Sequence, residues 1–254
     1  MTHLRTSDIS LSYGEFKVLQ EVNLQVDLKG LHGMIGPNGA GKTTLFAVLS
    51  GLMKPVTGEV RFRDISLTGA SPARRAQIGL GRTFQIPREF KHLTVRQNLL
   101  VGPRDQPGES LFSLYLQPGK VRKAEAEAQG RAEQLLDFLK LRSVADKLAG
   151  GLSGGQKKLL ELGRALMSEP KFILLDEPYA GVNPVLIEEI SERIREINRD
   201  RGIGFLIIEH NLMALNRLVN KLYVLDSGRL IAEGEPEAVL AHPQVRAAYM
   251  GAAA

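Results

Sequence analysis

Cysteine is absent from this chain of 254 residues, which excludes disulfide bonds and thiolate metal sites. Long apolar runs are absent as well, because no stretch approaches the roughly 18 consecutive apolar residues of a membrane-spanning helix. The sequence also lacks the basic start followed by an apolar stretch that is typical of a secretion signal. We therefore expect a soluble cytoplasmic protein. Its length and its apolar content of 43% suffice for one substantial α/β domain.

Runs of one charge are scarce. The net charge of +5 admits nucleic acid or an anionic membrane surface as a partner. The basic residues are dispersed, however, with Arg74-Arg75 and Lys157-Lys158 as short pairs, and no aromatic residues are interleaved with them for base stacking. We interpret them as a solvated mixed surface, with the cytoplasmic face of a membrane as the alternative. We expect no nucleic-acid partner.

The most informative segment is residues 36–44, which fits the phosphate-loop pattern Gly-x4-Gly-Lys-Thr. Leu31, Met34 and Ile35 predict a buried strand before it, and an apolar face at 45–49 predicts a helix after it, so a chance match to the pattern is the weaker alternative. Glycines let the loop point its N–H groups at a phosphate, on the positive end of that helix. Lys42 is placed to reach the β- and γ-phosphates, and the Thr43 hydroxyl to bind Mg²⁺. The predicted nucleotide-contacting residues here are Gly36, Pro37, Asn38, Gly39, Ala40, Gly41, Lys42, Thr43 and Thr44.

Two acidic residues follow the short apolar run at 172–175, which is typical of a parallel strand buried on both faces. We predict that Asp176 holds Mg²⁺ through water, and that Glu177 orients and polarises the attacking water. Seen alone, the two acids could simply end a strand. The phosphate loop in the same chain favours the catalytic interpretation.

A histidine, His210, follows the next apolar run at 205–208, just before a helix predicted to begin near Asn211. A lone histidine in such a place is more often a surface or helix-capping residue. The strand ends on one edge of a doubly wound sheet converge on the ligand crevice. We therefore predict that His210 contacts the γ-phosphate or holds the attacking water as a neutral imidazole.

A further anion site is predicted at Ser153, which precedes leucines spaced as on one face of a helix. Ser153 is a predicted N-cap, and Gly154 and Gly155 leave N–H groups bare at the positive helix end. Capping alone would also explain the serine. Gly163 falls inside the same predicted helix, where glycine costs on the order of 1 kcal/mol relative to alanine, and close packing against a neighbour would account for it.

The order of patterns along the chain predicts an α/β fold. Alternating residues between 4 and 67 predict antiparallel strands around the phosphate-loop unit, and the pattern is helical from about 86 to 166, with Gly-Pro-rich loop sequence at 102–119. From 171 onward strands and helices alternate, with a helix starting at Asn183-Pro184. No internal repeat is present. We expect a single nucleotide-binding domain over 1–254, with a mostly parallel core sheet, an antiparallel β subdomain and a helical subdomain.

Taken together and in this order, the motifs resemble those of the ATP-binding subunits of ABC transporters, over essentially the whole chain. The resemblance implies that Tyr13 stacks on adenine, although alone it could equally be a strand-edge packing residue. It implies that Gln85 contacts Mg²⁺ and the attacking water and relays the nucleotide state to membrane subunits, and that His210 is the switch histidine. It also implies that Ser153, Gly154, Gly155 and Gln156 form the signature motif and bind the γ-phosphate held by a second subunit in a head-to-tail dimer.

Finer features resemble the branched-chain amino acid importers and their LivG-type subunits. These features are segments 82–85, 98–102, 180–184 and 207–211 and the lengthened segment that reaches about Gly130. The resemblance implies ATP and Mg²⁺ as ligands. It implies two membrane permeases, a second ATPase and, indirectly, an extracellular solute-binding protein as partners, and a peripheral location on the inner face of the plasma membrane. Importers of urea or short amides share much of this pattern, so the solute stays open.

One departure from the family concerns Asn183, where the family commonly has Asp; the asparagine still caps a helix but removes a charge. Two other functions were weighed: the ATPase of a lipid or lipopolysaccharide exporter, and a non-transport ABC ATPase acting on nucleic acid. The lengthened segment disfavours the first, and the lack of coiled-coil insertions or a second nucleotide domain disfavours the second.

Overall fold

The computed structural model describes residues 3–83, 89–104, 106–109 and 111–251. The chain divides into two compact units. The first contains residues 1–85, 171–180 and 187–254, and the second contains residues 86–170 and 181–186. The predicted helical subdomain falls in the second unit.

A six-stranded sheet forms the centre of the first unit, in the order β10-β9-β3-β8-β7-β6. Its strands are β3 (Leu31–Ile35), β6 (Leu80–Arg82), β7 (Phe172–Asp176), β8 (Gly204–Ile208), β9 (Lys221–Asp226) and β10 (Arg229–Gly234). All neighbours are parallel except β9 and β10. Every residue of β3, β7 and β8 is buried, as expected for parallel strands covered on both faces. The carboxyl ends of these three neighbours lie at one edge of the sheet, where the predicted site residues follow them.

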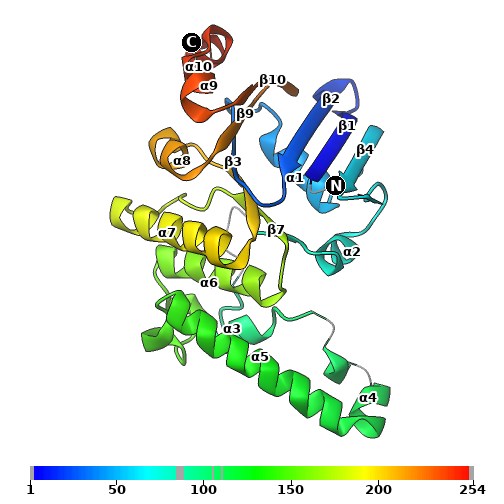
Figure 1. The fold of residues 1–254 in the computed structure, drawn as a ribbon, viewed down its shortest axis with the longest axis vertical. Coiled ribbons are helices and arrows are strands. Elements are labelled where there is room, and N and C mark those ends of the chain that lie inside the picture. The colour runs from blue at the N-terminus through cyan, green and yellow to red at the C-terminus, as the bar shows by residue number, and fades with distance from the viewer. Residues whose placement is uncertain (1–2, 84–88, 105, 110, 252–254) are drawn as a thin grey trace. The chain divides into compact units, whose positions relative to one another are not determined.

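A second, antiparallel sheet has the order β2-β1-β4-β5. Its strands are β1 (His3–Tyr13), β2 (Phe16–Asp27), β4 (Thr57–Phe62) and β5 (Ile65–Ser66), and β1, β2 and β4 run side by side in Figure 1. Leu4 pairs with Val26 on one side and with Phe62 on the other, and all three are buried. Their side chains join one hydrophobic core with α1 (Lys42–Ser50) and the buried faces of β3, β7 and β8. The predicted fold class is confirmed.

The remaining helices of the first unit are α2 (Pro72–Gln77), α7 (Pro184–Arg201, whose first turn belongs to the second unit), α8 (Leu212–Leu218), α9 (Pro236–Ala241) and α10 (Pro243–Gly251). Asn211 caps α8 by accepting from the N–H of Ala214 at 3.1 Å, where a helix start was predicted. Asn183 caps α7 in the same way, through the N–H of Leu186 at 3.0 Å. None of the helices in the described ranges is long and apolar enough to cross a membrane.

The second unit is helical, with α3 (Val95–Leu100), α4 (Leu111–Leu116), α5 (Pro118–Phe138) and α6 (Gly154–Met167), and with short 3-10 turns at Pro107–Glu109, Arg142–Val144 and Ala149–Gly151. α3, α5 and α6 pack against one another. A Cβ on Gly163 would lie 2.7 Å from Leu139 Cδ1 and 2.8 Å from Leu99 Cδ2. Close packing therefore explains the mid-helix glycine.

The segment predicted as a loop at 102–119 contains more structure than its composition indicates. A 3-10 turn and α4 lie within it. Pro118-Gly119 does not interrupt the chain but forms the first turn of α5, where proline loses no hydrogen bond because N–H groups of the first turn have no partner within the helix.

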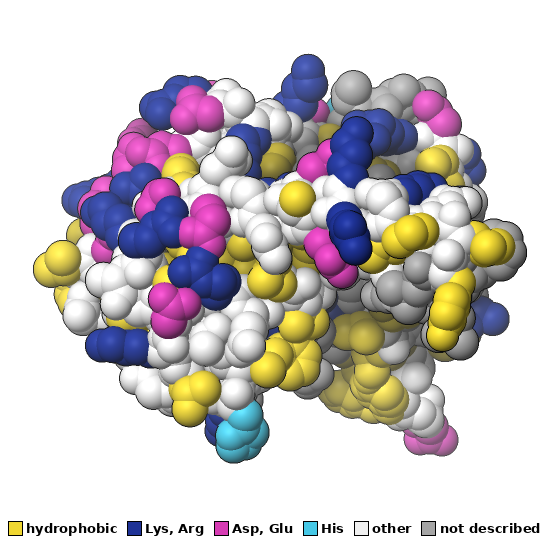
Figure 2. All heavy atoms as spheres, turned by 90° about the horizontal axis from the view of Figure 1, so that it is seen from below, with side chains coloured by type: hydrophobic (Ala, Val, Ile, Leu, Met, Phe, Trp, Pro, Cys, Tyr) yellow, Lys and Arg dark blue, Asp and Glu magenta, His cyan; other side chains and the backbone are white. Residues whose placement is uncertain are grey.

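The prediction that the short basic pairs are solvated is wrong for Arg75, which is 2% exposed. Its guanidinium donates to the carbonyl oxygens of Val48 and Leu49, both at 2.7 Å, and so satisfies the C-terminal end of α1. Burial lowers the pKa of Arg75. Lys158 is also buried. Elsewhere the expected mixture holds, and Figure 2 shows cationic and anionic side chains interspersed on the face seen from below.

Candidate functional site

One cavity in the first unit gathers residues from four distant segments of the chain. Its volume is about 510 Å³. It is lined by Tyr13, Phe16, Val18, Asn38, Gly39, Ala40, Gly41, Lys42, Thr43, Thr44, Glu177 and His210. The residues that follow β3, β7 and β8 thus meet at one place, because these strands are parallel neighbours.

The loop between β3 and α1 depends on glycine at two points. Gly36 (φ 155°) lies where a Cβ would overlap the carbonyl oxygen of Leu225, and a Cβ on Gly41 would lie 2.8 Å from the carbonyl oxygen of Val18. Gly41 is also the N-cap of α1 with φ 98°, a left-handed conformation that favours glycine. No side chain caps this helix. Its first N–H groups and the positive end of its dipole therefore face the cavity, as an anion site requires.

Lys42 is held inside this loop. Its ammonium group donates to the carbonyl oxygens of Gly36 at 2.7 Å and of Pro37 at 2.9 Å, and the side chain is 6% exposed. Burial lowers the pKa of Lys42, while the negative charges of Glu177 and Asp176 raise it. The lysine is therefore pre-oriented and lies within electrostatic reach of the predicted catalytic residue Glu177 and the predicted Mg²⁺ residue Asp176.

Asp176 ends β7 and is 2% exposed. Its Oδ2 accepts from a terminal nitrogen of Arg82 at 3.1 Å, and its N–H donates to the hydroxyl of Thr83 at 3.4 Å. Arg82 also reaches the hydroxyl of Ser50 at the end of α1, at 2.8 Å. Sequence reasoning assigned no role to Arg82. In the sequence, Arg82 stands out only as the basic residue that begins segment 82–85, one of the segments that resemble the ABC importers. It ends β6, the strand next to β7.

The fit of Mg²⁺ depends on the chemistry of the donors at this edge. Thr43, which carries a hydroxyl, lines the cavity, and Asp176 supplies a carboxylate one residue before Glu177. Hard oxygen donors of this kind, together with phosphates and water, are what Mg²⁺ prefers. The residues described here therefore fit the ion. Gln85, the third predicted Mg²⁺ contact and a predicted catalytic residue, lies outside the described residues.

Glu177 and His210 contact each other. Nε2 of His210 lies 3.1 Å from Oε1 of Glu177, and both residues line the cavity. Glu177 has φ 49°, which is unusual for a residue other than glycine. Such a backbone conformation costs about 1 to 3 kcal/mol and persists only where the surrounding structure enforces it.

The hairpin between β1 and β2 supplies the apolar rim of the cavity. Tyr13 is 53% exposed, and its hydroxyl donates to Sδ of Met53 at 3.2 Å. Phe16 pairs with Tyr13 across the hairpin and is exposed as well, so two aromatic rings border the cavity. Phe16 and Val18 were not predicted from the sequence. Their place beside the cavity depends on how β1 and β2 pair, and that register is visible only in the structure.

The predicted signature residues belong to the second unit and do not line this cavity. Ser153 caps α6: its hydroxyl accepts from the N–H of Gln156 at 3.3 Å, and the Gln156 side chain accepts from the N–H of Ser153 at 3.1 Å. The predicted N-cap is confirmed, with a reciprocal box that was not foreseen. Gly155 is buried, and a Cβ there would overlap the Leu186 side chain. Gly154 lies beside the carbonyl oxygen of Gly181.

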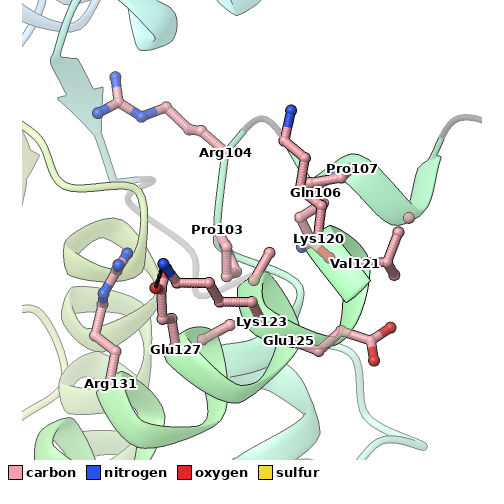
Figure 3. A pocket seen from close by; sticks show the side chains of 13 residues that line it. Pro103, Arg104, Gln106, Pro107, Lys120, Val121, Lys123, Glu125, Glu127 and Arg131 are labelled. Carbon is pink, nitrogen blue, oxygen red and sulfur yellow. Dashed lines mark ion pairs between the residues drawn. The ribbon is translucent and has the colours of Figure 1, made fainter. Parts of the chain in front are cut away.

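A second cavity, of about 390 Å³, lies in the second unit between the segment before α4 and the first turns of α5 (Figure 3). Its lining carries both signs of charge, and Lys123 and Glu127 form an ion pair there at 4.0 Å. None of the predicted site residues lines it.

Comparison with known proteins places this geometry among ATP-binding cassettes. The ABC transporter family model matches residues 19–180, and the model described as branched-chain amino acid ATP-binding cassette transporter matches residues 229–254. The chain is 44% identical to the probable branched-chain amino acid transport ATP-binding protein LivG of Methanocaldococcus jannaschii, over 99% of this chain and 98% of that protein. It is 36% identical to the high-affinity branched-chain amino acid transport ATP-binding protein LivG of Escherichia coli K12, over 98% of each.

Another relative has a different function in its name. The lipopolysaccharide export system ATP-binding protein LptB of Acidithiobacillus ferridurans is 36% identical, over 98% of this chain and 96% of that protein. Among solved structures, a nucleotide-free ATP-binding cassette from an ABC transporter is 42% identical, with a TM-score of 0.85 over 98% of this chain and 99% of that one. The ADP conformation of MJ1267, an ATP-binding cassette of an ABC transporter, is also 42% identical, with a TM-score of 0.84 over 99% of both chains.

Proposed function

This chain belongs to the family of ABC transporter ATP-binding proteins, and from that premise we propose that it hydrolyses ATP to drive the import of branched-chain amino acids through membrane permease subunits. One observation supports the ATPase function above all: the phosphate loop, Glu177 and His210 line the same cavity. The match of residues 229–254 to the branched-chain model carries the choice of solute class. Residues 1–254 act as one nucleotide-binding domain in this proposal.

ATP binding is assigned to the phosphate loop and the hairpin rim. The N–H groups at the start of α1 and the ammonium of Lys42 bind the β- and γ-phosphates, and Tyr13 stacks on adenine. Thr43 and Asp176 would hold Mg²⁺, with Gln85 as a further contact. When bound, Mg²⁺ neutralises the phosphate charge and orients the phosphates for attack.

Hydrolysis is assigned to Glu177 and His210. Glu177 orients the attacking water and accepts its proton at a carboxylate oxygen. His210, 3.1 Å away through Nε2, holds that carboxylate and reaches toward the γ-phosphate.

Coupling to transport is assigned to a head-to-tail dimer. Ser153, Gly154, Gly155 and Gln156 of one ATPase bind the γ-phosphate held by the loop of another. Because ATP then contacts both subunits only in the closed state, it favours closure. Changing the closed population from 1:99 to 99:1 takes about 5.5 kcal/mol. A few charge-assisted hydrogen bonds, each roughly 1.5 to 3 kcal/mol, are sufficient for that.

Phe90 is the proposed contact with the permeases. It is 45% exposed, the guanidinium of Arg164 lies 4.8 Å from its ring centre, and the buried Asn98 side chain binds both its N–H and its carbonyl oxygen. An exposed aromatic residue on a fixed backbone suits an interface. The partners are two membrane permeases, a second ATPase that is a paralogue or a second copy of this chain, and indirectly an extracellular solute-binding protein. The chain then lies peripherally on the inner face of the plasma membrane.

Lipopolysaccharide export is the second candidate, because the lipopolysaccharide export ATP-binding protein LptB of Acidithiobacillus ferridurans is 36% identical. The branched-chain match at residues 229–254 favours import.

The test is transport in reconstituted liposomes that contain the permeases, the companion ATPase and the solute-binding protein that co-purify with this chain. We expect ATP-dependent uptake of labelled leucine, isoleucine or valine, lost in Glu177→Gln and kept in Glu237→Gln, whose substituted side chain is exposed. Uptake of urea or acetamide without leucine would reassign the solute. Extraction of lipopolysaccharide without uptake would reassign the function.

A further inference from the structure

Glu209 directly follows β8 and precedes His210 on the same loop, and it is 4% exposed. One of its carboxylate oxygens, Oε1, accepts from the N–H of Tyr179 at 2.6 Å. The other, Oε2, accepts from the N–H of His210 at 2.9 Å and of Asn211 at 3.3 Å. One buried side chain therefore binds the backbone of both loops.

The loop after Glu177 needs such an anchor. The parallel pairing of β7 with β8 ends at Asp176 and Ile208. The N–H of Glu177 still donates to the carbonyl oxygen of Ile208 at 3.0 Å, but with φ 49° the chain then leaves the strand direction. The bond from Tyr179 to Glu209 is the next link across. This hydrogen bond continues the connection between the two segments beyond the end of the strand pairing. The strained residue Glu177 therefore lies between two hydrogen bonds that hold its backbone.

Tyr179 has a second anchor at its other end. It is 4% exposed, its hydroxyl lies 2.6 Å from Oγ of Ser191 on α7, and that oxygen in turn donates to the carbonyl oxygen of Ile187 at 2.8 Å. Burial raises the pKa of Tyr179 to about 12. The loop after Glu177 is thus held by its backbone through Glu209 and by its side chain through α7.

The chemistry of the three donors requires a carboxylate at position 209. An ionised carboxylate only accepts, and its two oxygens serve two loops at once. A glutamine of the same shape has one acceptor oxygen, so its NH₂ group would face a backbone N–H and leave one loop unbound. Burial and the charge of Glu177 raise the pKa of Glu209, and the three N–H groups oppose that shift.

We propose that Glu209 is a positioning residue for ATP hydrolysis, whose buried carboxylate sets the separation of Glu177 and His210 by binding the backbone of both loops. The proposal rests on the hydrolytic roles of Glu177 and His210 given above. It concerns geometry only, since Glu209 does not line the cavity and does not touch the nucleotide in this assignment.

The central test is Glu209→Gln, assayed for ATP hydrolysis and for binding of a non-hydrolysable ATP analogue. We expect kcat to fall about 100-fold, the scale of a misplacement of about 1 Å at a reacting centre. KM for ATP and Kd for the analogue should stay within about twofold, because the phosphate loop provides most of the phosphate contacts. Glu209→Asp keeps two acceptor oxygens and places no NH₂ group against a backbone N–H, so it should restore part of kcat although its side chain is one methylene shorter.

Two control variants separate positioning from stability. Ser191→Ala removes the other anchor of Tyr179 and should lower the melting temperature, because a hydrogen bond that stabilises the fold is lost. Its kcat should stay within about threefold, because Glu209 still binds both loops. Glu237→Gln carries the same chemical change at an exposed position and should change neither. A kcat of Glu209→Gln within twofold of wild type would overturn the proposal. A second contrary result would be a loss of kcat in Glu209→Gln that its lower melting temperature explains, judged by how kcat and melting temperature change together in Ser191→Ala.

Amide hydrogen exchange keeps the inference testable apart from the transport function. In Glu209→Gln the N–H groups of at least one loop, that of Tyr179 or those of His210 and Asn211, should exchange faster, while that of Glu177, bound to a strand carbonyl, should be unchanged. Unchanged protection at both loops would refute the bridge. A wild-type chain without ATPase activity would refute the proposed function but leave this readout intact.

Discussion

Two helix N-termini in this protein, those of α1 and α6, have the same dipole but are built differently. α1 begins after Gly41 in a left-handed conformation with no side-chain cap. α6 begins after Ser153 with a complete capping box, in which Ser153 and Gln156 bind each other's backbone N–H groups. The first end is therefore open to a phosphate. At the second, the two side chains are already engaged, and the box does not use the N–H groups of Gly154 and Gly155.

We expect the anion site at α1 to be complete within one chain, and the site at α6 to depend on a second subunit. The α1 end has its own counter-charge in Lys42, oriented by two loop carbonyls. At the α6 end the capping box engages the side chains of Ser153 and Gln156, and an N-cap of this kind contributes about 1 kcal/mol to stability. A single chain should therefore bind ATP through α1 alone, and α6 should matter only when a second subunit presents a phosphate to it.

The largest test of this comparison is Glu177→Gln. We expect kcat to fall about 10²- to 10⁴-fold, the usual range for removing a general base, while ATP binding at α1 is kept. The trapped ATP should then hold two subunits together, which light scattering after size-exclusion chromatography would detect. A nucleotide-loaded variant that stays monomeric, alone and beside its companion ATPase, would contradict the role given to α6.

Lys42→Ala should break the α1 end itself. Loss of one charge-assisted hydrogen bond of roughly 1.5 to 3 kcal/mol weakens ATP binding by about 10- to 100-fold. The measurement is titration with a fluorescent ATP analogue. Lys157→Ala, at the start of α6 where Lys157 pairs with Glu89 at 3.0 Å, is the matched control and should leave the Kd of the monomer unchanged. Equal losses in both variants would erase the difference between the two helix ends.

Ser153→Ala should affect stability without affecting the monomer's nucleotide binding. Removing the cap should lower the free energy of unfolding by about 1 kcal/mol, as measured by urea denaturation. Ser153→Asn keeps a capping oxygen and should recover most of that loss. The ATP affinity of the isolated chain should be the same in all three proteins, and weaker binding in Ser153→Ala alone would show that α6 contributes within one chain.

The smallest effect concerns His32 on β3, the strand that leads into the phosphate loop. Its Nε2 lies 2.9 Å from the carbonyl oxygen of Asp27, and burial lowers its pKa from the usual 6.5. Below pH 6.5 the unfolded chain therefore binds more protons at this position than the folded chain does, so stability is full above pH 6.5 and falls as pH decreases toward the folded-state pKa.

His32→Gln should make the free energy of unfolding depend less steeply on pH between 7 and 5. His92→Gln, at an exposed position, is the control. An unchanged pH dependence in His32→Gln would show that this histidine does not contribute to acid destabilisation.

Much of the α1 end could be predicted from local sequence. The apolar residues of β3, the glycines of the loop and Lys42 lie close together in the sequence. The structural role of each can therefore be predicted from its immediate neighbours. The N-cap role of Ser153 was predictable for the same reason, while its reciprocal bond with Gln156 became evident only in the structure. Gln85 and the contribution of α6 to a shared site stay predictions.

The remaining contacts depend on strand order and register, which no local pattern records. Arg82 reaches Asp176 because β6 lies next to β7. Arg75 looked like a surface residue beside Arg74, yet it caps α1 from a separate helix.

The sequence by itself determined the parallel strands, the phosphate loop and the catalytic candidates, since periodicity of 2 or 3.6 and the demands of glycine act over a few residues. Only the tertiary structure decided that one cavity joins Tyr13, Lys42, Glu177 and His210. It also decided that the carboxylate of Glu209 bridges two loops. The physical reason is that these contacts are made across neighbouring strands, and strand neighbours are selected by the packing of the whole sheet.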